Sequence, residues 1–499
     1  MKKLENQIYD RKYTNAVMIH LALIILVVMY VEGMLTPSLP SIAQGFGVTI
    51  DQVSLVLSVY MITGVALSPI VGKMGDIYGK KKMMVVMIFI YAAAVSVTGF
   101  SPNFTFMVAS RAVQGVGLTI MPLGMSLIRE EFPRELVPKA QALISGMFGA
   151  GFAISLPLGS FISNDFGWRM TYHTAIPFVV ILAFVTLFYV RESKFRLPDV
   201  KIDIVGAVLL GIPLTMIVLS LSEGSTWGWT SLPVLSLLFV GLVLFIPMFL
   251  YERNYHKSGG EAIFDMDLLK KRNVLMANIT LTVTGIGMYL SMQTLSYRFE
   301  TPAPYGFGLS ILDTGLSMVA FAIGMIVFAV ITGKIITRIG IKPLAITGIA
   351  VAGFGFLELT TNPGYYATLL TEVVIGSGIS IMNASIINLL ILSVEPRKMG
   401  LATSMNSTFR FLGSSIGAPV AGAIMSAYQV SITFPTANGP ISESFPSVTS
   451  FSMAFLAGAI TFIVSVLFVI FAREMLGKKG EGYMNTTRES VNISDANPE

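Results

Sequence analysis

The chain has 499 residues, of which 54% are hydrophobic and only 12% are charged, with a formal net charge of +5. A soluble domain carries about twice that share of charged residues, so the composition indicates a polytopic membrane protein and excludes an ordinary soluble one. With no cysteine and only three histidines, the chain offers no disulfide and no thiolate zinc site, and a histidine-rich metal site is not expected.

The positive net charge does not require a nucleic-acid partner, because an excess of Lys and Arg in cytoplasmic loops produces it in membrane proteins. The sequence has no Gly-x-x-x-x-Gly-Lys-Ser/Thr phosphate loop, so ATP binding of the usual kind is not expected. No cofactor is expected either, and any pumping would draw on an ion gradient or on the gradient of the cargo.

Hydropathy predicts about fourteen membrane-spanning helices. They are expected near residues 16–37, 50–71, 83–100, 104–127, 140–162, 171–190, 203–222, 231–251, 274–297, 310–332, 343–361, 366–393, 400–425 and 451–472. Between these spans, the odd-numbered loops hold only Arg169 and Arg298, whereas the other loops and both termini hold nearly all remaining Lys and Arg. The positive-inside rule therefore predicts that both termini lie in the cytoplasm, which requires an even number of spans.

Glu32 lies inside the first predicted span, in the segment Tyr30–Pro40. A charge within a span is costly, so such a residue is a functional candidate. A carboxyl group there can alternate between its protonated and charged forms as its access to water changes. We interpret Glu32 as a proton carrier. The alternative is a carboxylate satisfied by a neighbouring arginine, or by water near the outer surface.

The segment Gly72–Lys82 lies between the second and third predicted spans and is interpreted as a short polar loop. Its glycines permit close helix approach and positive φ, and Lys80–Lys82 place it on the cytoplasmic side. Asp76 is a lone acid at a helix end, where a carboxylate needs a helix N-terminus or an arginine as partner. The alternative is an ordinary basic loop that follows the positive-inside rule.

In the fourth predicted span, Arg111 and Gln114 share a helix face, and Gly115 permits close helix contact. An arginine within a few ångströms favours the charged form of a carboxyl group, so Glu32 and Arg111 are a candidate protonation switch. The alternative is a structural arginine that binds backbone carbonyls.

The fifth predicted span carries small residues at intervals of three and four, which form a smooth face for helix packing, and a proline that permits a kink. Gly149, Pro157 and Gly159 are its candidate residues. Helix packing alone is the alternative explanation for these glycines.

The loop Gly333–Lys342 repeats the pattern of Gly72–Lys82, with Thr337 in the place of Asp76. Such an echo implies two homologous halves. We expect a six-helix bundle over residues 1–195, two linking helices over 196–262, a second six-helix bundle over 263–478 and a disordered tail over 479–499.

Several of these segments resemble motifs of the major facilitator superfamily. Gly72–Lys82 is similar to the loop pattern G-x-x-x-D-x-x-G-K/R-K/R, and Arg111–Gly117 is similar to the fourth-helix pattern R-x-x-Q-G-x-G. Tyr30–Pro40 and Gly146–Ser160 resemble, with departures, the first- and fifth-helix motifs of the fourteen-helix drug/proton antiporter branch. Further similar segments are Gly167–Arg169 with Pro177, Glu223–Trp229, Arg397–Asn406 and Arg410–Gly417.

The resemblance implies that Glu32 takes the place of the branch's first-helix aspartate and that Arg111 influences protonation of a neighbouring carboxyl group. It also implies a conformational latch on the cytoplasmic side, formed by Gly72, Asp76, Gly79, Lys80 and Lys81. In the fifth-helix motif, Leu156 and Ser160 stand where glycine is usual, so antiport is less firmly implied than the fold.

Three acids lie at or within predicted spans of the second half. Asp313, Glu358 and Glu372 are candidate substrate contacts, because a buried carboxylate attracts cationic organic ligands. Glu358 has apolar neighbours and is expected to lie deepest. Asp313 has the alternative role of capping a helix, and Glu372 that of an acid near the interface.

The expected fold class is an all-α polytopic membrane protein with the major facilitator fold, two six-helix bundles and two linking helices. The expected function is proton-coupled export of amphipathic or cationic drugs from the cytoplasm across the cell membrane, by alternating access, as a monomer and not an enzyme. One alternative is a major facilitator exporter of a lipid, peptide or metabolite. Another is a membrane sensor or scaffold that transports nothing.

Overall fold

The computed structural model describes residues 11–133, 136–192, 202–258, 263–395, 399–436 and 439–475. The predicted tail over 479–499 lies outside these ranges. Contacts divide the chain into two compact units. Unit 1 comprises residues 1–263, 289–319 and 414–454, and unit 2 comprises residues 264–288, 320–413 and 455–499.

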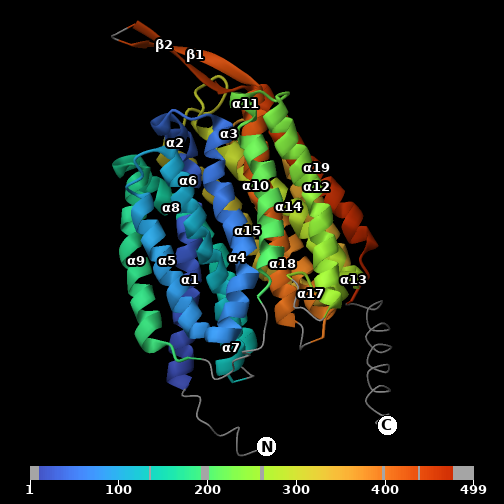
Figure 1. Ribbon diagram of the computed structural model, residues 1–499. Helices are drawn as coiled ribbons and strands as arrows, with labels where there is room; N and C mark the ends of the chain where they lie inside the picture. The colour runs from blue at the N-terminus through green and yellow to red at the C-terminus, as the bar shows by residue number, and fades with distance from the viewer. Residues whose placement is uncertain are drawn as a thin grey trace, which may run out of the picture. The chain divides into compact units, whose positions relative to one another are not determined.

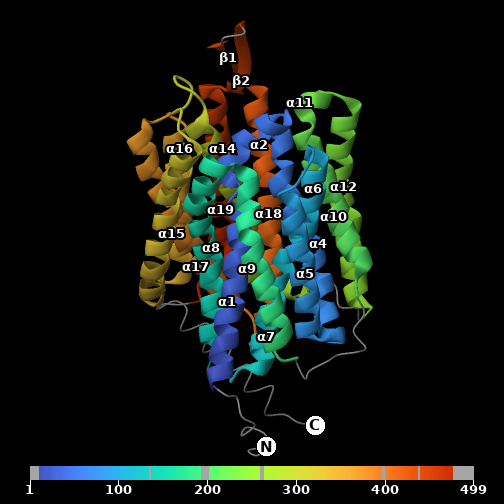
Figure 2. The same cartoon turned by 90° about the vertical axis from the view of Figure 1, so that its left-hand side faces the viewer.

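The amino-terminal part of unit 1 is built from helices in chain order (Figure 1). They are α1 (Arg11–Gly33), η1 (Thr36–Ser38), α2 (Leu39–Phe46), α3 (Ile50–Val53), α4 (Leu55–Tyr78), α5 (Lys80–Thr98), α6 (Phe104–Gln114), η2 (Gly115–Thr119), α7 (Ile120–Glu131), α8 (Val137–Phe166), α9 (Trp168–Tyr189), α10 (Ile204–Ser222), α11 (Gly224–Trp227) and α12 (Leu232–Lys257). Helices α1, α8 and α9 lie side by side (Figure 2), and α10 packs on α12 and α4.

Four long helices of the second half contribute residues to both units. They are α14 (Arg272–Glu300), α15 (Ile311–Ile339), α18 (Met399–Ala427) and α19 (Val448–Phe471). Unit 2 also holds α13 (Met266–Lys270), α16 (Ile341–Leu359) and α17 (Tyr365–Leu392), of which the last two pack on each other.

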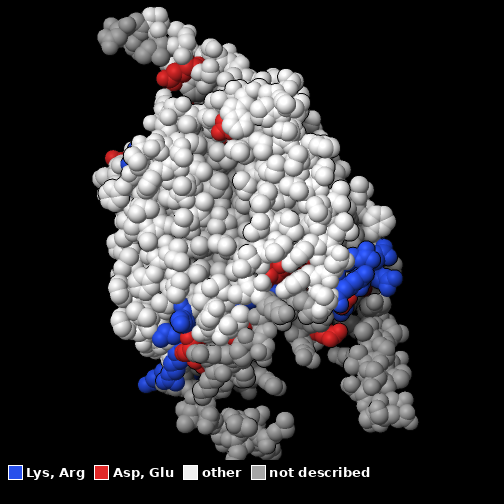
Figure 3. All heavy atoms as spheres, in the orientation of Figure 1, with Lys and Arg blue, Asp and Glu red and all other residues white. Residues whose placement is uncertain are grey.

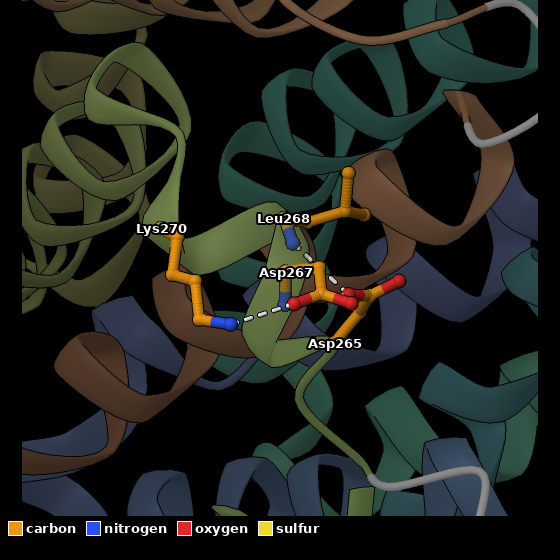
Figure 4. Close-up of polar contacts among 4 residues, drawn as sticks. All are labelled: Asp265, Asp267, Leu268 and Lys270. Atoms are coloured by element: carbon orange, nitrogen blue, oxygen red, sulfur yellow. Dashed lines mark hydrogen bonds and ion pairs between the residues drawn. The ribbon is translucent and has the colours of Figure 1, made fainter. Parts of the chain in front are cut away.

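The short helix α13 is held by two local contacts (Figure 4). Asp265 caps its start, because Asp265 Oδ1 accepts the amide protons of Asp267 and Leu268 at 2.9 Å. Lys270 forms an ion pair with Asp267 at 2.8 Å.

Twelve helices of the described ranges are long and apolar enough to cross a membrane. Helices α8 and α18, of 30 and 29 residues, cover the remaining two predicted spans. Fourteen spans therefore stay a prediction that the helix lengths support.

Many apolar side chains lie on the outside of the helices, where a lipid bilayer would cover them. On α12, Leu232 is 80% exposed and Phe239 is 68% exposed. Figure 3 shows a surface that is nearly free of charge along the helices, with Lys and Arg gathered at helix ends. A soluble protein rarely exposes apolar surface on this scale, so the chain is a membrane-embedded, multi-pass protein.

The segment that joins α18 to α19 forms an antiparallel ribbon in unit 1. Strand β1 (Gln429–Thr436) pairs with β2 (Gly439–Pro446), with Val430 opposite Phe445 and Pro435 opposite Pro440. Alternation places Val430, Ile432, Phe434 and Phe445 on one face of the ribbon together with Glu443, and places Ser431, Thr433, Ser442 and Ser444 on the other. We call the end of unit 1 at which α2, α3, α11 and this ribbon lie the hairpin end (Figure 1).

The structure corrects the prediction that Gly72–Lys82 and Gly333–Lys342 are loops. Helix α4 continues to Tyr78 and α5 begins at Lys80, so Gly79 alone makes the turn. In the same way, Gly340 alone separates α15 from α16. Hydropathy ends a span where the side chains become polar, but the backbone stays helical until a glycine adopts positive φ, here +111° at Gly79 and +101° at Gly340.

Candidate functional site

Glu32 lies in the last turn of α1 and is only 2% exposed. The hydroxyl of Tyr289, on the part of α14 that belongs to unit 1, donates a hydrogen bond to Glu32 Oε1. The next residue, Gly33, faces Ser155 of α8 so closely that a Cβ atom would collide with it. The carboxyl group is thus held inside unit 1 and is not turned toward lipid.

Arg111 is fully buried on α6. Its Nε donates to the carbonyl of Val56 at 2.9 Å, and its Nη1 donates to Gln114 Oε1 at 3.1 Å. The guanidinium carbon lies 4.6 Å from the ring centre of Tyr60, a cation–π distance. Among the described residues, Nη2 has no hydrogen-bond partner. Arg111 is thus a fully buried cation held by one backbone carbonyl, one side-chain amide and one aromatic ring.

Tyr60 and Tyr91 link these two charged residues into one cluster. Both phenols are fully buried, and both have Glu32 and Arg111 as electrostatic neighbours. Glu32 is not among the groups that bond Arg111 directly. Glu32 and Arg111 therefore share these two phenols as electrostatic neighbours, and the contacts described for Arg111 do not include a direct ion pair with Glu32. The cluster has a single carboxylate and no histidine, which does not suit a metal ion.

Gln114 and Gly115 fix the positions of the residues in this cluster, Gln114 through hydrogen bonds and Gly115 through a close helix contact. Gln114 Nε2 donates to Thr98 Oγ1 while its Oε1 receives Arg111, so the amide fixes the arginine's orientation. A Cβ on Gly115 would lie 2.5 Å from the carbonyl oxygen of Tyr60. The glycine thus lets η2 and α4 approach closely, as the sequence predicts.

At the opposite end of α4 from the hairpin, Lys80 is the centre of a charged group. Its Nζ lies 2.8 Å from Asp76 and 2.6 Å from Glu130 of α7, and its side chain is only 3% exposed. The partner of Asp76 is this lysine one turn away, and not the helix N-terminus or the arginine that the sequence predicts. Gly72 makes no close approach, because nothing lies within 4 Å of its Cβ position.

We expect Lys80→Gln to lower the stability of the protein by about 2 kcal/mol, because two carboxylates would then face each other without a cation. The partial exposure of Asp76 and Glu130 keeps the effect below that of a fully buried pair. The measurement is the melting temperature of the purified protein in detergent. Lys82→Gln, at an exposed position, is the matched control, and an equal effect of the two changes would contradict the prediction.

Two glutamates that follow α9 and α19 cap the helices that begin after the glycine turns. Glu192 accepts the amide protons of Lys81 and Lys82, each at 3.0 Å. In unit 2, Glu474 accepts those of Ile341 and Lys342 at 3.0 and 2.8 Å. A carboxylate at a helix N-terminus satisfies free amides and complements the helix dipole. The same joint thus occurs in each half of the sequence.

A second pair of contacts completes each joint. The amide proton of Arg191 bonds the hydroxyl of Tyr13 at 2.7 Å, and that of Arg473 bonds Asn273 Oδ1 at 2.7 Å. In both cases the residue before the capping glutamate is tied to the start of a bundle's first helix. This correspondence supports the predicted internal repeat.

The close contact between α8 and α1 is made by residues partly different from those predicted. A Cβ on Gly159 would lie 2.6 Å from the carbonyl oxygen of Met34, directly after α1, and a Cβ on Gly151 would lie closer still to that of Leu26 in α1. Gly149 faces open space, which corrects its expected role, because residue 149 lies off the face that carries residues 151, 155 and 159. Pro157 lies within the continuous helix α8.

The three acids of the second half differ in burial from the prediction. Asp313 is exposed and bonds Ser310 at the start of α15, which favours the capping interpretation. Glu358, expected to lie deepest, is half-buried in the last turn of α16, where Thr371 donates to it. Glu372 of α17 is the fully buried one. Hydropathy does not locate the end of a helix closely enough to predict which of these three acids is the most deeply buried.

Tyr289, Glu130 and the capping glutamates were not among the residues predicted from the sequence. The dipeptides Arg191-Glu192 and Arg473-Glu474 each follow the last span of a predicted bundle, so this repeat was a signal for the caps. Tyr289 carried no local signal, because its partner Glu32 is 257 residues away in the chain.

A buried carboxyl, guanidinium and phenol cluster inside a multi-pass helical fold is typical of membrane transporters, and the family comparison assigns this chain to that class. The family model of the Major Facilitator Superfamily matches residues 21–266, 202–418 and 275–484. The chain belongs to this superfamily.

Known relatives are similar over most of the chain. Multidrug transporter protein MdtP of Bacillus subtilis (strain 168) is 26% identical over 428 residues, which cover 85% of this chain and 77% of that protein. Riboflavin transporter RibZ of Clostridioides difficile (strain 630) is 24% identical, covering 87% of this chain and 92% of that one. The crystal structure of a mutant of the nucleoside transporter NupG matches with a TM-score of 0.62 and 14% identity, over 92% of this chain and 100% of that chain.

Proposed function

We propose that this transporter exports amphipathic or cationic compounds from the cytoplasm in exchange for protons, by alternating access. The observation that carries the proposal is the burial of Glu32 beside Tyr289, near Arg111, Tyr60 and Tyr91. A carboxyl group in such a place is stable when neutral, or when charged and opposed by a cation. It can therefore carry one proton per conformational cycle.

In the proposed cycle, Glu32 takes up a proton while it has access to the outside and releases it after access has changed to the cytoplasm. Arg111 favours release, because a nearby cation stabilises the carboxylate. The Asp76, Lys80 and Glu130 group and the Glu192 cap lie at the end where Lys80–Lys82 gather. We assign the proposed cytoplasmic latch to these residues, all of which belong to the amino-terminal half of the chain.

The multidrug transporter among the relatives supports a drug as cargo, while the riboflavin transporter supports a metabolite as the alternative. We also propose that the protein lies in the cell membrane as a monomer, with both termini in the cytoplasm. Glu372 of unit 2 is the proposed contact for a cationic cargo, because it is the fully buried acid of the three candidates.

The test uses the purified protein in liposomes that carry an internal pH dye and an imposed pH gradient. We expect that cationic dyes and drugs, added one at a time, cause proton movement that empty liposomes do not show. Proton movement with riboflavin-like metabolites alone would favour the alternative cargo. If transport of a compound were proven by radiolabel uptake and no proton moved, proton coupling would be wrong.

A further inference from the structure

Asp51 is a fully buried acid that the proposed proton site does not use. It lies in α3, at the hairpin end of unit 1. Its Oδ2 accepts both the amide proton of Ser225, at 3.1 Å, and the hydroxyl proton of Ser225, at 2.6 Å. Its Oδ1 accepts the hydroxyl proton of Ser426 at 3.0 Å. Among the described residues, no Lys, Arg or His lies within ion-pair distance of this carboxylate.

The donors to Asp51 come from parts of the chain that are far apart in sequence. Asp51 itself follows the first helices, Ser225 belongs to α11 between the two linking helices, and Ser426 lies near the end of α18. A single carboxylate therefore joins the amino half, the linking helices and the carboxyl half. All three bonds have a carboxylate acceptor, which makes them stronger than neutral ones.

Neighbouring contacts hold α3 from both sides. Toward the linking helices, Gln52 Nε2 donates to Glu223 at 3.0 Å, and Ser54 lies 3.2 Å from Ser222. Toward the carboxyl half, Gln293 Nε2 donates to the carbonyl of Ile50 at 3.4 Å. A Cβ on Gly422 of α18 would lie 2.7 Å from Asp51 Cα. Helix α3 is thus wedged between elements of the two halves.

Further contacts between the sequence halves occur at this end of unit 1. Ser296 of α14 donates to the carbonyl of Thr36 at 2.8 Å, and a Cβ on Gly315 of α15 would lie 2.6 Å from the carbonyl oxygen of Leu156. Alternating access requires the two halves to separate at each end in turn. These contacts are the ones that opening of the hairpin end must break.

We propose that Asp51 is a positioning residue of a gate at the hairpin end, in which Ser426 and Ser225 are its partners. Through Ser426 the carboxylate holds the carboxyl half against α3 and keeps this end closed. Through Ser225 it makes the linking helices α10 and α12 part of the gate. The inference rests on the proposed alternating-access function, but it assigns residues and a role to the linking helices that proton coupling does not require.

The absence of cysteine from the chain allows a direct test with single introduced cysteines. Thr314→Cys is the reporter, because Thr314 is fully buried beside Gly315. Thr230→Cys, at an exposed position, is the control for general reactivity. The rate of maleimide labelling is measured on the purified full-length protein, without cargo and without a pH gradient.

We expect Ser426→Ala and Asp51→Asn to raise the labelling rate at Thr314→Cys about tenfold or more, because each removes a hydrogen bond with a charged partner that exists only in the closed state. Whichever way its amide lies, Asn has only one acceptor end, so it cannot accept from both Ser225 and Ser426 as the carboxylate does. Ser225→Ala is expected to raise the rate as well, because the linking helices take part. The labelling of Thr230→Cys stays unchanged in all of them.

A melting curve for each variant separates opening of the gate from unfolding. If Asp51→Asn fails to fold, Ser426→Ala, which deletes one hydroxyl, decides the question. Unchanged labelling of Thr314→Cys in folded Ser426→Ala protein would overturn the proposal, and unchanged labelling in Ser225→Ala would remove the linking helices from the gate. Failure of proton coupling would leave these labelling results intact, so the two proposals are tested separately.

Discussion

Replacing Glu32 with glutamine is expected to reduce cargo-driven proton movement to the level of empty liposomes, a loss of at least about tenfold. Glutamine has nearly the shape of a protonated glutamate, and its carbonyl oxygen can still accept the hydroxyl proton of Tyr289. The side chain therefore still fits its buried place but can neither take up nor release a proton. The measurement is the proton flux in liposomes that is caused by a cargo identified with the unaltered protein.

Glu443→Gln provides a matched control, because it makes the same chemical change at a ribbon residue that bonds Gln44 near the surface. We expect this variant to keep its proton flux. Binding of the cargo to Glu32→Gln, measured by calorimetry, is expected to persist, because the variant loses charge transfer and not folding. Full proton flux in Glu32→Gln would remove Glu32 from the coupling mechanism.

Replacing Gly79 with alanine is expected to destabilise the protein by about 3 kcal/mol or more, because two effects add. The backbone at φ +111° is costly for any residue with a side chain, by about 1–3 kcal/mol. In addition, the new Cβ would lie 2.6 Å from the carboxyl carbon of Glu192, which would displace the cap of α5. Gly340→Ala in unit 2 meets Glu474 at 3.0 Å with φ +101° and should behave alike.

Gly72→Ala is the informative control, since Gly72 opens the same sequence motif. It lies inside α4, and its Cβ position has open space around it, so alanine should be neutral or raise stability by up to about 1 kcal/mol through helix propensity. The measurement is the melting temperature of each purified variant. If Gly72→Ala lowered the melting temperature as much as Gly79→Ala, the capped turn would not be the reason why the motif contains glycine.

The sequence was sufficient for the family, for the helical membrane fold and for the burial of Glu32 and Arg111. These inferences depend on hydropathy and on charges inside spans, which are local properties of the chain. The close approach at Gly115 was also predictable, because a glycine beside a buried arginine on a packed helix has few other uses.

The partners of the key residues were not predictable, because they depend on packing between distant segments. Lys80 bridges Asp76 and Glu130, which are 54 residues apart in the numbering of the chain. Asp51 was not a candidate, since it stands at the start of a predicted span, where an acid at a helix end is common. The ranking of Glu358 above Glu372 was wrong because α16 ends one residue after Glu358.

The β1–β2 ribbon also supplies a way to determine which side of the membrane each face of the protein meets. Its strands are paired in a defined register between residues 429 and 446, so a short antibody epitope can be grafted into the ribbon without altering a helix. An antibody that stains intact cells carrying the graft would place this face outside the cell. Staining only after permeabilisation would reverse the topology and, with it, the direction of transport.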